Sequence, residues 1–517
     1  MRQEAKKLIE TILSDNPREY FTLANIGFEK ESLRVINSAI SRSSHPKELG
    51  SALCNEKITT DFSESQLELI TPPLKSGINS HLALDQIHYF VNSKINNEML
   101  WPLSMPPEIV SENDIPIASY GSSYLGMFKE TYRKGLSIRY GRTMQAISGF
   151  HFNYSLPEKI WEPIIKSTNN DQKEIRSEIY LNMLRNIFRM NWLILYLFGS
   201  SPALTKNFLK NKNEKFTKLD EKTFYLQYAT SLRMSDYGYC NLSRSNTFVS
   251  LNSINDYVRD IRSATLTIDP IFRNFKDGRE HQLNPNTLQI EDEYYAVARA
   301  KSNCNQYKRT SSNLLEGGID FIEIRSLDLD PFSRTGIDVE TIHFFEVFMA
   351  YCFSKKSELI NKDQSEIIKQ NDLLVAKYGR KPDLILIDKH KSIPLREWAH
   401  MILQEMLPIA EKMDKNEGIY VDSIRNCIEK IDDPSLTLSG LLIHKLLNEK
   451  RNHIELGNHI GKLNKEYYLE TYDSNFSDPD AFEIEAANSL QKQDALEKEA
   501  KGSIKTFEDY KAEYMEY

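Results

Sequence analysis

The sequence has few cysteines, and no two of them form a C-x-x-C pair. The five cysteines lie far apart along the chain, at Cys54, Cys240, Cys304, Cys352 and Cys427. An odd number of widely spaced cysteines is typical of reduced thiols, and it argues against a disulfide framework or a structural zinc site. We therefore expect a protein that works in the reducing environment of the cytoplasm.

Long hydrophobic runs are also absent. The longest, from Trp192 to Phe198, is far shorter than the roughly 20 residues that a helix needs to cross a bilayer. Residues 1–14 lack the continuous apolar core of a signal peptide. These absences predict a soluble, cytoplasmic protein that does not bind a membrane.

No segment concentrates positive charge. The chain has 65 lysines and arginines against 73 aspartates and glutamates, and its net charge is −8. The basic residues are dispersed among the acids, which argues against a nucleic acid as partner. An anionic ligand must therefore be bound by a few local cations.

The common nucleotide-binding and hydrolytic motifs are missing. The stretch from Gly457 to Leu463 is similar to a phosphate-binding loop, but it is one residue short and has Leu463 where a serine or threonine should hold a metal ion. There is no G-x-S-x-G elbow, H-E-x-x-H helix or dinucleotide-binding fingerprint. A nucleotide would have to be bound by metal ions on a sheet.

What the sequence does contain is a pair of acids at a spacing of two in a predicted strand. Residues i and i+2 of a strand point to one face, so Glu29 and Glu31 project together while Phe28 points to the other side. Two neighbouring carboxylates repel each other unless a cation lies between them. The pattern therefore indicates a cation site.

Three further predicted strands repeat this division into a polar and an apolar face. One carries Glu68 shortly after Asp61, one carries His151 between two phenylalanines, and one carries Glu323 and Arg325. For any one strand alone, a solvated outer face is the simpler interpretation. Their recurrence favours one sheet with a hydrophobic face and a face of acids, a histidine and an arginine.

Such a face has a defined chemistry. Mg²⁺ prefers oxygen ligands and is typically held by a few carboxylates together with the phosphates of a substrate. Because an arginine accompanies the acids, we expect a reaction at the phosphate of a nucleotide.

The chain is longer than one typical domain. Helical spacing of apolar residues predicts helices over 79–98 and 174–197. We expect a catalytic body with the active-site sheet over residues 1–350 and a mainly helical part over 351–517 that is integral to the same fold. The highly charged stretch 483–517 predicts an exposed helix or tail.

Long ordered stretches of the chain resemble the bacterial glutamate–cysteine ligase family of the proteobacterial type. The agreement runs over nearly the whole length and thins after residue 355. It rests on residues 27–35, 49–53, 58–62, 69–72, 99–106, 147–157, 229–236, 288–291 and 317–328.

The resemblance implies a fold and a reaction. The fold is of the α+β class, with a glutamine-synthetase-like antiparallel sheet whose polar face forms the active site, helices around it and a helical C-terminal part. The reaction is the ATP-dependent ligation of the γ-carboxylate of L-glutamate to the amine of L-cysteine through a γ-glutamyl phosphate, the first step of glutathione biosynthesis.

The resemblance also implies roles for individual residues. The ligands of Mg²⁺ or Mn²⁺ would be Glu29, Glu31, Asp61, Glu68, His151 and Glu323. The catalytic residues would be Arg325 and Arg233, and the substrate-binding residues Tyr132, Arg133, Tyr239 and Tyr295. Glutathione would be a feedback inhibitor, and the protein a monomer.

Other interpretations of these residues stay open. His151 could be a packed, hydrogen-bonded residue, and the tyrosines could belong to the core. The protein could be a related carboxylate–amine ligase with a different amine acceptor, because nothing in the metal-binding strands specifies cysteine. It could also be a non-catalytic protein that binds ATP or an amino acid, although Glu323 and Arg325 argue against this.

Overall fold

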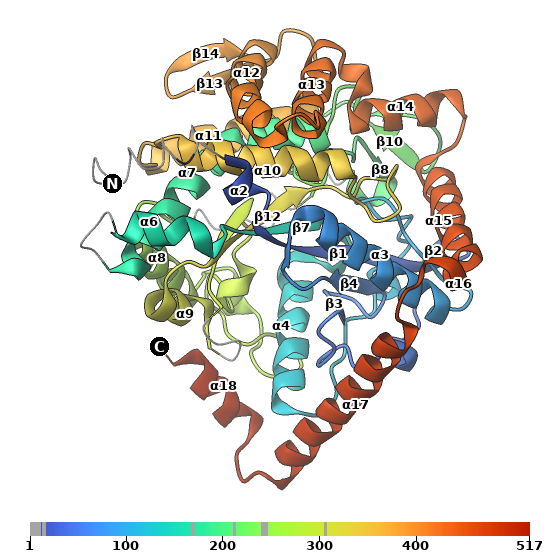
Figure 1. Cartoon of the computed structure of the whole chain (residues 1–517). Coiled ribbons are helices and arrows are strands. Elements are labelled where there is room, and N and C mark those ends of the chain that lie inside the picture. Colours follow the sequence, from blue (N-terminus) through green and yellow to red (C-terminus); the bar gives the residue numbers. More distant parts are fainter. Residues whose placement is uncertain are drawn as a thin grey trace.

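The computed structural model describes residues 12, 17–166, 171–209, 214–238, 247–303 and 308–516. An antiparallel sheet lies at the centre, with helices around it (Figure 1). Its strands follow the order β11 (Ala298–Lys301), β12 (Phe321–Leu327), β7 (Phe150–Ser155), β1 (Asn25–Ile36), β4 (Gln66–Ile70) and β3 (Ile58–Thr60). The short strands β2 (Ala39–Ile40), β5 (Leu74–Lys75) and β6 (Met99–Leu100) also pair with β1.

In the described part of the chain, two small sheets lie outside this one. The first has the order β8 (Ala203–Thr205), β10 (Thr223–Tyr225) and β9 (Thr217–Lys218). The second is the hairpin of β13 (Ile385–Asp388) and β14 (Lys391–Pro394).

The described helices of the first 350 residues are α2 (Pro17–Phe21), α3 (Gly77–Lys94), α4 (Tyr124–Tyr140), α5 (Arg142–Gln145), α6 (Trp161–Lys166), α7 (Gln172–Phe198), α8 (Ile254–Leu266), α9 (Thr310–Gly317) and α10 (Val339–Ser354). Both helices that apolar spacing predicted, over 79–98 and 174–197, are confirmed as α3 and α7. Helix α7 begins where Asp171 accepts a hydrogen bond from the Lys173 amide at 3.2 Å, and it ends before Gly199. Its second half is buried on every side from Met190 to Phe198, because it lies between the sheet and other helices.

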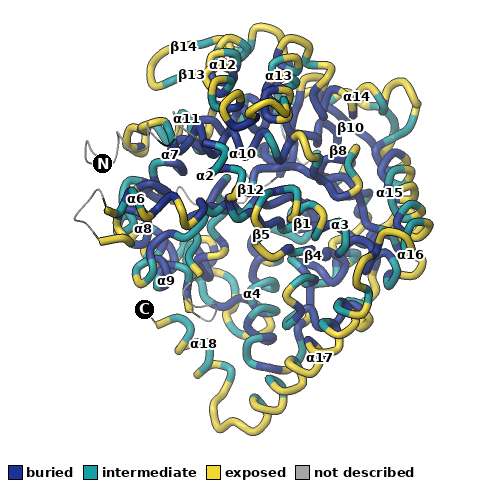
Figure 2. Tube along the Cα trace, viewed as in Figure 1, coloured by how far each residue is buried: buried dark blue, intermediate teal, exposed yellow. Residues whose placement is uncertain are grey.

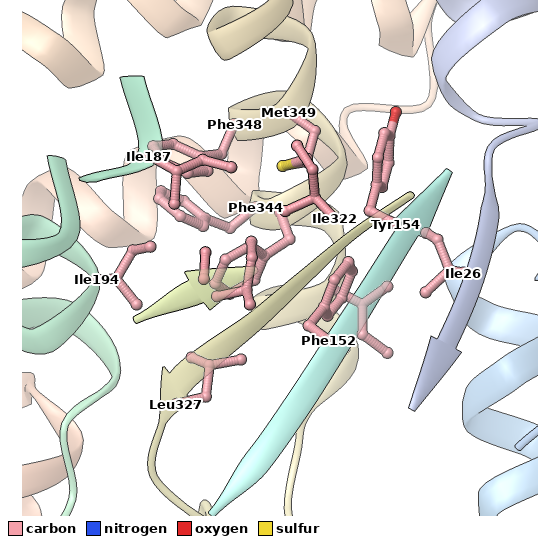
Figure 3. Packing of buried hydrophobic residues seen from close by; sticks show 14 of the residues in the cluster. Ile26, Phe152, Tyr154, Ile187, Ile194, Ile322, Leu327, Phe344, Phe348 and Met349 are labelled. Carbon is pink, nitrogen blue, oxygen red and sulfur yellow. The ribbon is translucent and has the colours of Figure 1, made fainter. Parts of the chain in front are cut away.

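The apolar face of the sheet packs against α10 and α7. Phe152 of β7 lies between Phe28 of β1 and Phe345 of α10, with ring centroids 5.3 and 4.9 Å away. Figure 3 shows Phe344, Phe348 and Met349 above the strands. The alternation of apolar and polar residues along the strands thus leaves the opposite face free for a site.

The rest of the chain is mainly helical, as predicted. Its helices are α11 (Lys362–Tyr378), α12 (Leu395–Asp414), α13 (Ile419–Asp432), α14 (Leu438–Asn448), α15 (His453–Glu470), α16 (Tyr472–Asn475), α17 (Pro479–Gly502) and α18 (Phe507–Met515). Helices α12 and α13 pack over α10, and α15 packs on α3. Figure 2 shows α17 and α18 largely exposed on the outside, where they return to the N-terminal half. Among the described residues, no helix combines the length and apolar character that a membrane span requires.

Candidate active site

Four strands bring the predicted acids and His151 onto one face of the sheet. In the strand register, Glu29 lies opposite His151 of β7, and Glu31 lies opposite Glu68 of β4. Glu323 of β12 lies opposite Asn153, two residues from His151. The expected division into one hydrophobic and one polar face is confirmed.

His151 lies at the centre of this cluster. Its Nδ1 atom is 3.0 Å from Oε2 of Glu29 and 3.7 Å from Oε1 of Glu323, and its Nε2 atom is 3.4 Å from Oε1 of Glu31. One possible ligand atom from each of Glu29, Glu68 and His151 lies within 4.8 Å of the other two. The spacing is that of groups which could share a metal ion.

The carboxylates on β1 and β4 repel one another. Burial, together with the charges of Glu29, Asp61 and Glu31, raises the pKa of Glu68 well above its usual value. Burial and Asp61 likewise raise the pKa of Glu31. The pKa of Glu29 is lowered, because the hydrogen bond with His151 and nearby positive charges outweigh the opposing effect of burial. On this side of the site, nearby cations therefore neutralise Glu31 and Glu68 only in part.

Glu323 has the opposite environment. Burial alone would raise its pKa, but Lys301, Arg325, Arg299 and His151 hold that pKa well below the usual value. The Arg325 guanidinium donates a hydrogen bond to Oε1 of Glu323 at 3.1 Å, and Nζ of Lys301 lies 3.5 Å from Oε2. Cations therefore gather on the β11 and β12 side.

Lys301 and Arg299 were not among the residues predicted from the sequence. Both belong to β11, where Arg299 pairs with Glu323 in the sheet. The signal was present but short: two basic residues alternate with Ala298 and Ala300 over four positions. So short a strand does not stand out in a region of loops.

Arg233 lies next to Arg325 and is held by a buried acid. Its Nη2 atom donates to the Arg325 carbonyl oxygen at 2.8 Å, and its Nη1 atom is 3.6 Å from Oδ1 of Asp328. A Cβ atom at Gly149 would collide with the Arg233 guanidinium and displace it. The backbone amide of Gly149 donates to Oε2 of Glu31 at 2.6 Å, which connects Arg233 to the acidic cluster.

Asp328 joins two segments that are distant from it in sequence. Its carboxylate accepts hydrogen bonds from the Ser200 amide at 2.8 Å, the Ser201 hydroxyl at 2.6 Å and the Ser231 hydroxyl at 2.9 Å. The carboxylate is fully buried. Its role could not be predicted from the sequence, because its hydrogen-bond partners come together only in the folded chain.

The predicted substrate-binding residues form two walls beside the sheet. Helix α4 carries Tyr132 and Arg133, and Arg133 donates through Nε to the carbonyl oxygen of Asp61. Tyr295 lies on the opposite wall and donates to Oε1 of Gln145 at 3.4 Å. Burial and the proximity of Tyr295 raise the pKa of Tyr132. Tyr239 lies outside the described residues.

A cavity of about 300 Å³ opens beside this face. His151, Arg233, Tyr295 and Arg325 line it together with residues of α7 and α11. Two arginines, the histidine and one tyrosine of the predicted site therefore line one space that a small molecule can enter.

The fold and the site together define a class of protein. Several acids that can hold divalent cations, with lysine and arginine beside them, suit phosphoryl transfer, which asks a protein mainly for positioning and charge neutralisation. The adjoining cavity can hold small substrates. This combination suits an enzyme that transfers a phosphoryl group to a small substrate.

Comparisons with known proteins identify the family. Residues 9–375 match the family model described as glutamate-cysteine ligase. The glutamate–cysteine ligase of Pseudomonas fluorescens is 39% identical over 490 residues, which cover 93% of this chain and 92% of the relative. The crystal structure of the Francisella tularensis glutamate–cysteine ligase in complex with AMP matches with a TM-score of 0.88 and 33% identity, over 95% of this chain and 98% of that one.

The chain therefore belongs to the glutamate–cysteine ligase family, and it is an enzyme of the ligase class. The family's reaction is the ATP-dependent formation of γ-glutamylcysteine, the first step of glutathione synthesis. The resemblance in the sequence and the expected fold class are both confirmed. A bifunctional glutathione synthetase from Pasteurella multocida shares the fold at a TM-score of 0.73 and 24% identity, and this chain covers 56% of its length.

Proposed function

We propose that this chain ligates L-glutamate to L-cysteine in two steps on the polar face of the sheet. The γ-phosphoryl group of ATP passes to the γ-carboxylate of glutamate, and the cysteine amine then attacks the acyl phosphate and releases phosphate. The observation that carries the proposal is the cluster of Glu29, Glu31, Glu68, His151 and Glu323 beside Arg325 and Lys301.

The donor atoms of the cluster fit Mg²⁺ or Mn²⁺. Oε2 of the buried Glu323 has no hydrogen-bond partner, although Lys301 lies 3.5 Å away, and repulsion raises the pKa of Glu68. The ions would be held by Glu29, Glu31, Asp61, Glu68, His151 and Glu323. Bound there, they would neutralise the phosphate charge of ATP.

Arg325 would stabilise the phosphoryl group during transfer. It is half-buried at the edge of the cavity, and its fork of donors suits an anion with several oxygens. Lys301 adds a second positive charge on the same side. Arg233, held by Asp328, would bind a carboxylate of the glutamate substrate.

The acceptor would bind between the walls that carry Tyr132 and Tyr295. Arg133 lies beside Asp61 and adds a positive charge to the same wall. An aromatic pocket favours a small, soft side chain, and such a pocket separates near-isosteric side chains by only about 1–3 kcal/mol. We therefore expect cysteine to be preferred, 2-aminobutyrate to be used measurably, and serine to be poorer because its hydroxyl would lose water without gaining a partner.

Other parts of the proposal concern regulation and assembly. Glutathione should inhibit in competition with glutamate, because it carries the same γ-glutamyl group. The protein should act as a monomer in the cytoplasm, with residues 1–350 as the catalytic body and 351–517 as an integral helical part. Neither a nucleic acid nor a membrane is needed for the reaction.

Steady-state ADP release with glutamate, ATP and a panel of amines tests the proposal. ADP release should depend on glutamate and fall in the order cysteine, 2-aminobutyrate, serine. If ADP release is faster with serine than with cysteine, the chain is a related carboxylate–amine ligase with another acceptor. If no amine raises ADP release above the rate with ammonia, the acceptor site is wrongly placed, and binding without turnover would indicate a non-catalytic protein.

A further inference from the structure

Helix α18 packs against the N-terminal half of α4, the helix that carries Tyr132 and Arg133. A capping box begins α18: the Thr506 amide donates to Oδ2 of Asp509 at 2.7 Å, and the Asp509 amide donates to Oγ1 of Thr506 at 3.2 Å. The turn between α17 and α18 is fixed to α4, because the Tyr124 hydroxyl donates to the carbonyl oxygens of Ala500, at 3.2 Å, and Lys505. The charged tail thus has a defined docking position.

Aromatic rings join the two helices. The ring of Phe128 lies 4.5 Å from that of Tyr514 and 6.1 Å from that of Tyr510, measured between centroids. Tyr124 stacks on Tyr510 at 5.9 Å. Tyr132 follows Phe128 by one helical turn and packs in the same hydrophobic cluster. The inner face of α18 is therefore in contact with a wall of the acceptor pocket.

The end of α18 reaches the second wall. Nη1 of Arg309 donates to the carbonyl oxygen of Met515 at 3.0 Å, and Nε of Arg309 lies 3.3 Å from Oε1 of Glu291. Glu291 also accepts hydrogen bonds from the amide of Ser311, at 2.7 Å, and from its hydroxyl, at 2.6 Å. Glu291 begins the short segment that leads to Tyr295. Helix α18 thus contacts the supports of both walls.

The other end of α4 has its own connection to this segment. Glu293 accepts hydrogen bonds from Nη1 of Arg139 at 3.0 Å and from the Tyr140 hydroxyl at 2.8 Å. The Arg139 and Glu293 side chains are fully buried. The walls are therefore joined rigidly near Tyr140, and α18 joins them at the opposite end of α4.

We propose that α18 is a brace for the acceptor pocket: by contacting Phe128 on one side and Arg309 on the other, it sets the separation between Tyr132 and Tyr295. Tyr514, in the last turn of α18, is the positioning residue. The inference rests on the proposed function only in assigning the acceptor amino acid to this pocket.

The packing lets this role be separated from folding. Phe128, Leu283 and Ile290 form a small cluster that is distinct from the large core behind the sheet. A nine-residue helix such as α18 is marginal in isolation, so its position depends on these contacts. Weakening them should loosen the pocket while the sheet and its core stay folded.

Three variants of the full-length protein test the proposal. Tyr514→Ala removes the ring that contacts Phe128, and Tyr514→Phe keeps it. Glu508→Ala changes an exposed residue of the same helix that contacts Lys511. Aromatic contacts of this kind predict a rise of about two- to ten-fold in KM for cysteine with Tyr514→Ala. KM for ATP, kcat and the main thermal transition should stay near the wild-type values, and the other two variants should behave like wild type throughout.

A chain ending at Gly502 lacks the whole brace and should show a larger rise in KM for cysteine than Tyr514→Ala. An unchanged KM for cysteine in Tyr514→Ala would overturn the proposal. Equal rises in KM for cysteine and for ATP would also overturn it. The same holds if only kcat falls, in proportion to the fraction of folded protein, because either result shows a general structural role. A failure of the proposed function can be distinguished from a failure of this proposal, because wild-type protein would then release no ADP that depends on glutamate and cysteine.

Discussion

The two sides of the polar face use the same residue type in opposite ways. Glu68 on β4 has a raised pKa because other carboxylates surround it, whereas Glu323 on β12 has a lowered pKa because Lys301, Arg325 and Arg299 surround it. We call the β1 and β4 part with Asp61 the acidic side, and the β11 and β12 part with Arg233 the basic side. His151 lies between them, near both Glu29 and Glu323.

The two sides of the polar face therefore contribute differently to the reaction that we propose. On the acidic side, nearby cations do not offset the burial and mutual repulsion of Glu31 and Glu68, whose pKa values stay raised, and we propose that this side binds metal ions from solution. The basic side neutralises its glutamate with fixed side chains, and its Arg233 and Arg325 also line the cavity, where they can contact an anionic group. A phosphate that lies between the two sides would be bound by both, which is what transfer to a carboxylate requires.

Glu323→Gln should have the largest effect, because it disturbs both sides. The substitution keeps the shape but removes the charge that Lys301 and Arg325 neutralise, and it removes one expected metal ligand. ADP release should fall by at least about 10–100-fold. The exposed Glu358→Gln is the control and should keep wild-type activity. Unchanged kinetics with Mg²⁺ in Glu323→Gln would remove this residue from the site.

Arg325→Lys tests the basic side alone. Lysine keeps the positive charge but loses the planar fork of donors, so kcat should fall roughly 10-fold or more while the affinity for ATP changes little. Arg176→Lys, at a surface ion pair with Glu158, is the matched control. Weaker ATP binding with a normal kcat would show that Arg325 contacts only the bound nucleotide and not the reacting group.

Asp328→Asn should have a smaller effect that acts through Arg233. Asparagine still accepts hydrogen bonds from Ser200 and Ser201 but no longer attracts the guanidinium, so KM for glutamate should rise roughly three- to ten-fold. In an Arg233→Gln background, Asp328→Asn should raise KM for glutamate little further, because the guanidinium that Asp328 positions is absent. Fully additive effects of the two substitutions would show that Asp328 has only a structural role.

Glu68→Gln should raise the stability of the metal-free protein. The pKa of Glu68 is higher in the folded state than in the unfolded state, so folding favours its protonated form. Its contribution to stability is fully present below the unfolded pKa of about 4.3 and is lost as the pH rises toward the folded pKa. At neutral pH, without divalent cations, the variant should melt roughly 1–3 °C higher than wild type, and the difference should shrink as the pH falls toward 4.

Thermal melting across this pH range, with and without Mg²⁺, measures the effect of Glu68→Gln. Added Mg²⁺ should reverse the order, because the wild type then gains a ligand that the variant has lost. A lower melting temperature for the metal-free variant at neutral pH would mean that Glu68 is already neutralised in the fold.

The acidic side could be predicted from sequence because its signal is local. Glu29 and Glu31 lie two positions apart in a long strand, and a period of two assigns both to one face without knowledge of the partners. The strand register could not be predicted, because pairing Glu31 with Glu68 depends on a partner strand more than thirty positions away.

The basic side and the position of α18 were harder to predict from the sequence, for two physical reasons. Arg299 and Lys301 lie in a four-residue strand, and the role of Asp328 depends on serines near positions 200 and 231 that meet it only in the folded chain. In α18 the many charges on the outer face predict an exposed helix, which is correct. The same charges make the spacing of Tyr510 and Tyr514 hard to recognise, and their partner Phe128 lies far away in sequence.

Direct titration of the purified protein with Mn²⁺, followed by electron paramagnetic resonance or calorimetry, tests the central claim most directly, because it measures binding without turnover. Wild-type protein with a non-hydrolysable ATP analogue should bind Mn²⁺, and Glu29→Gln should bind it at least about 10-fold more weakly. Equal Mn²⁺ affinity in the two proteins would contradict the assignment of the carboxylate cluster as the metal site.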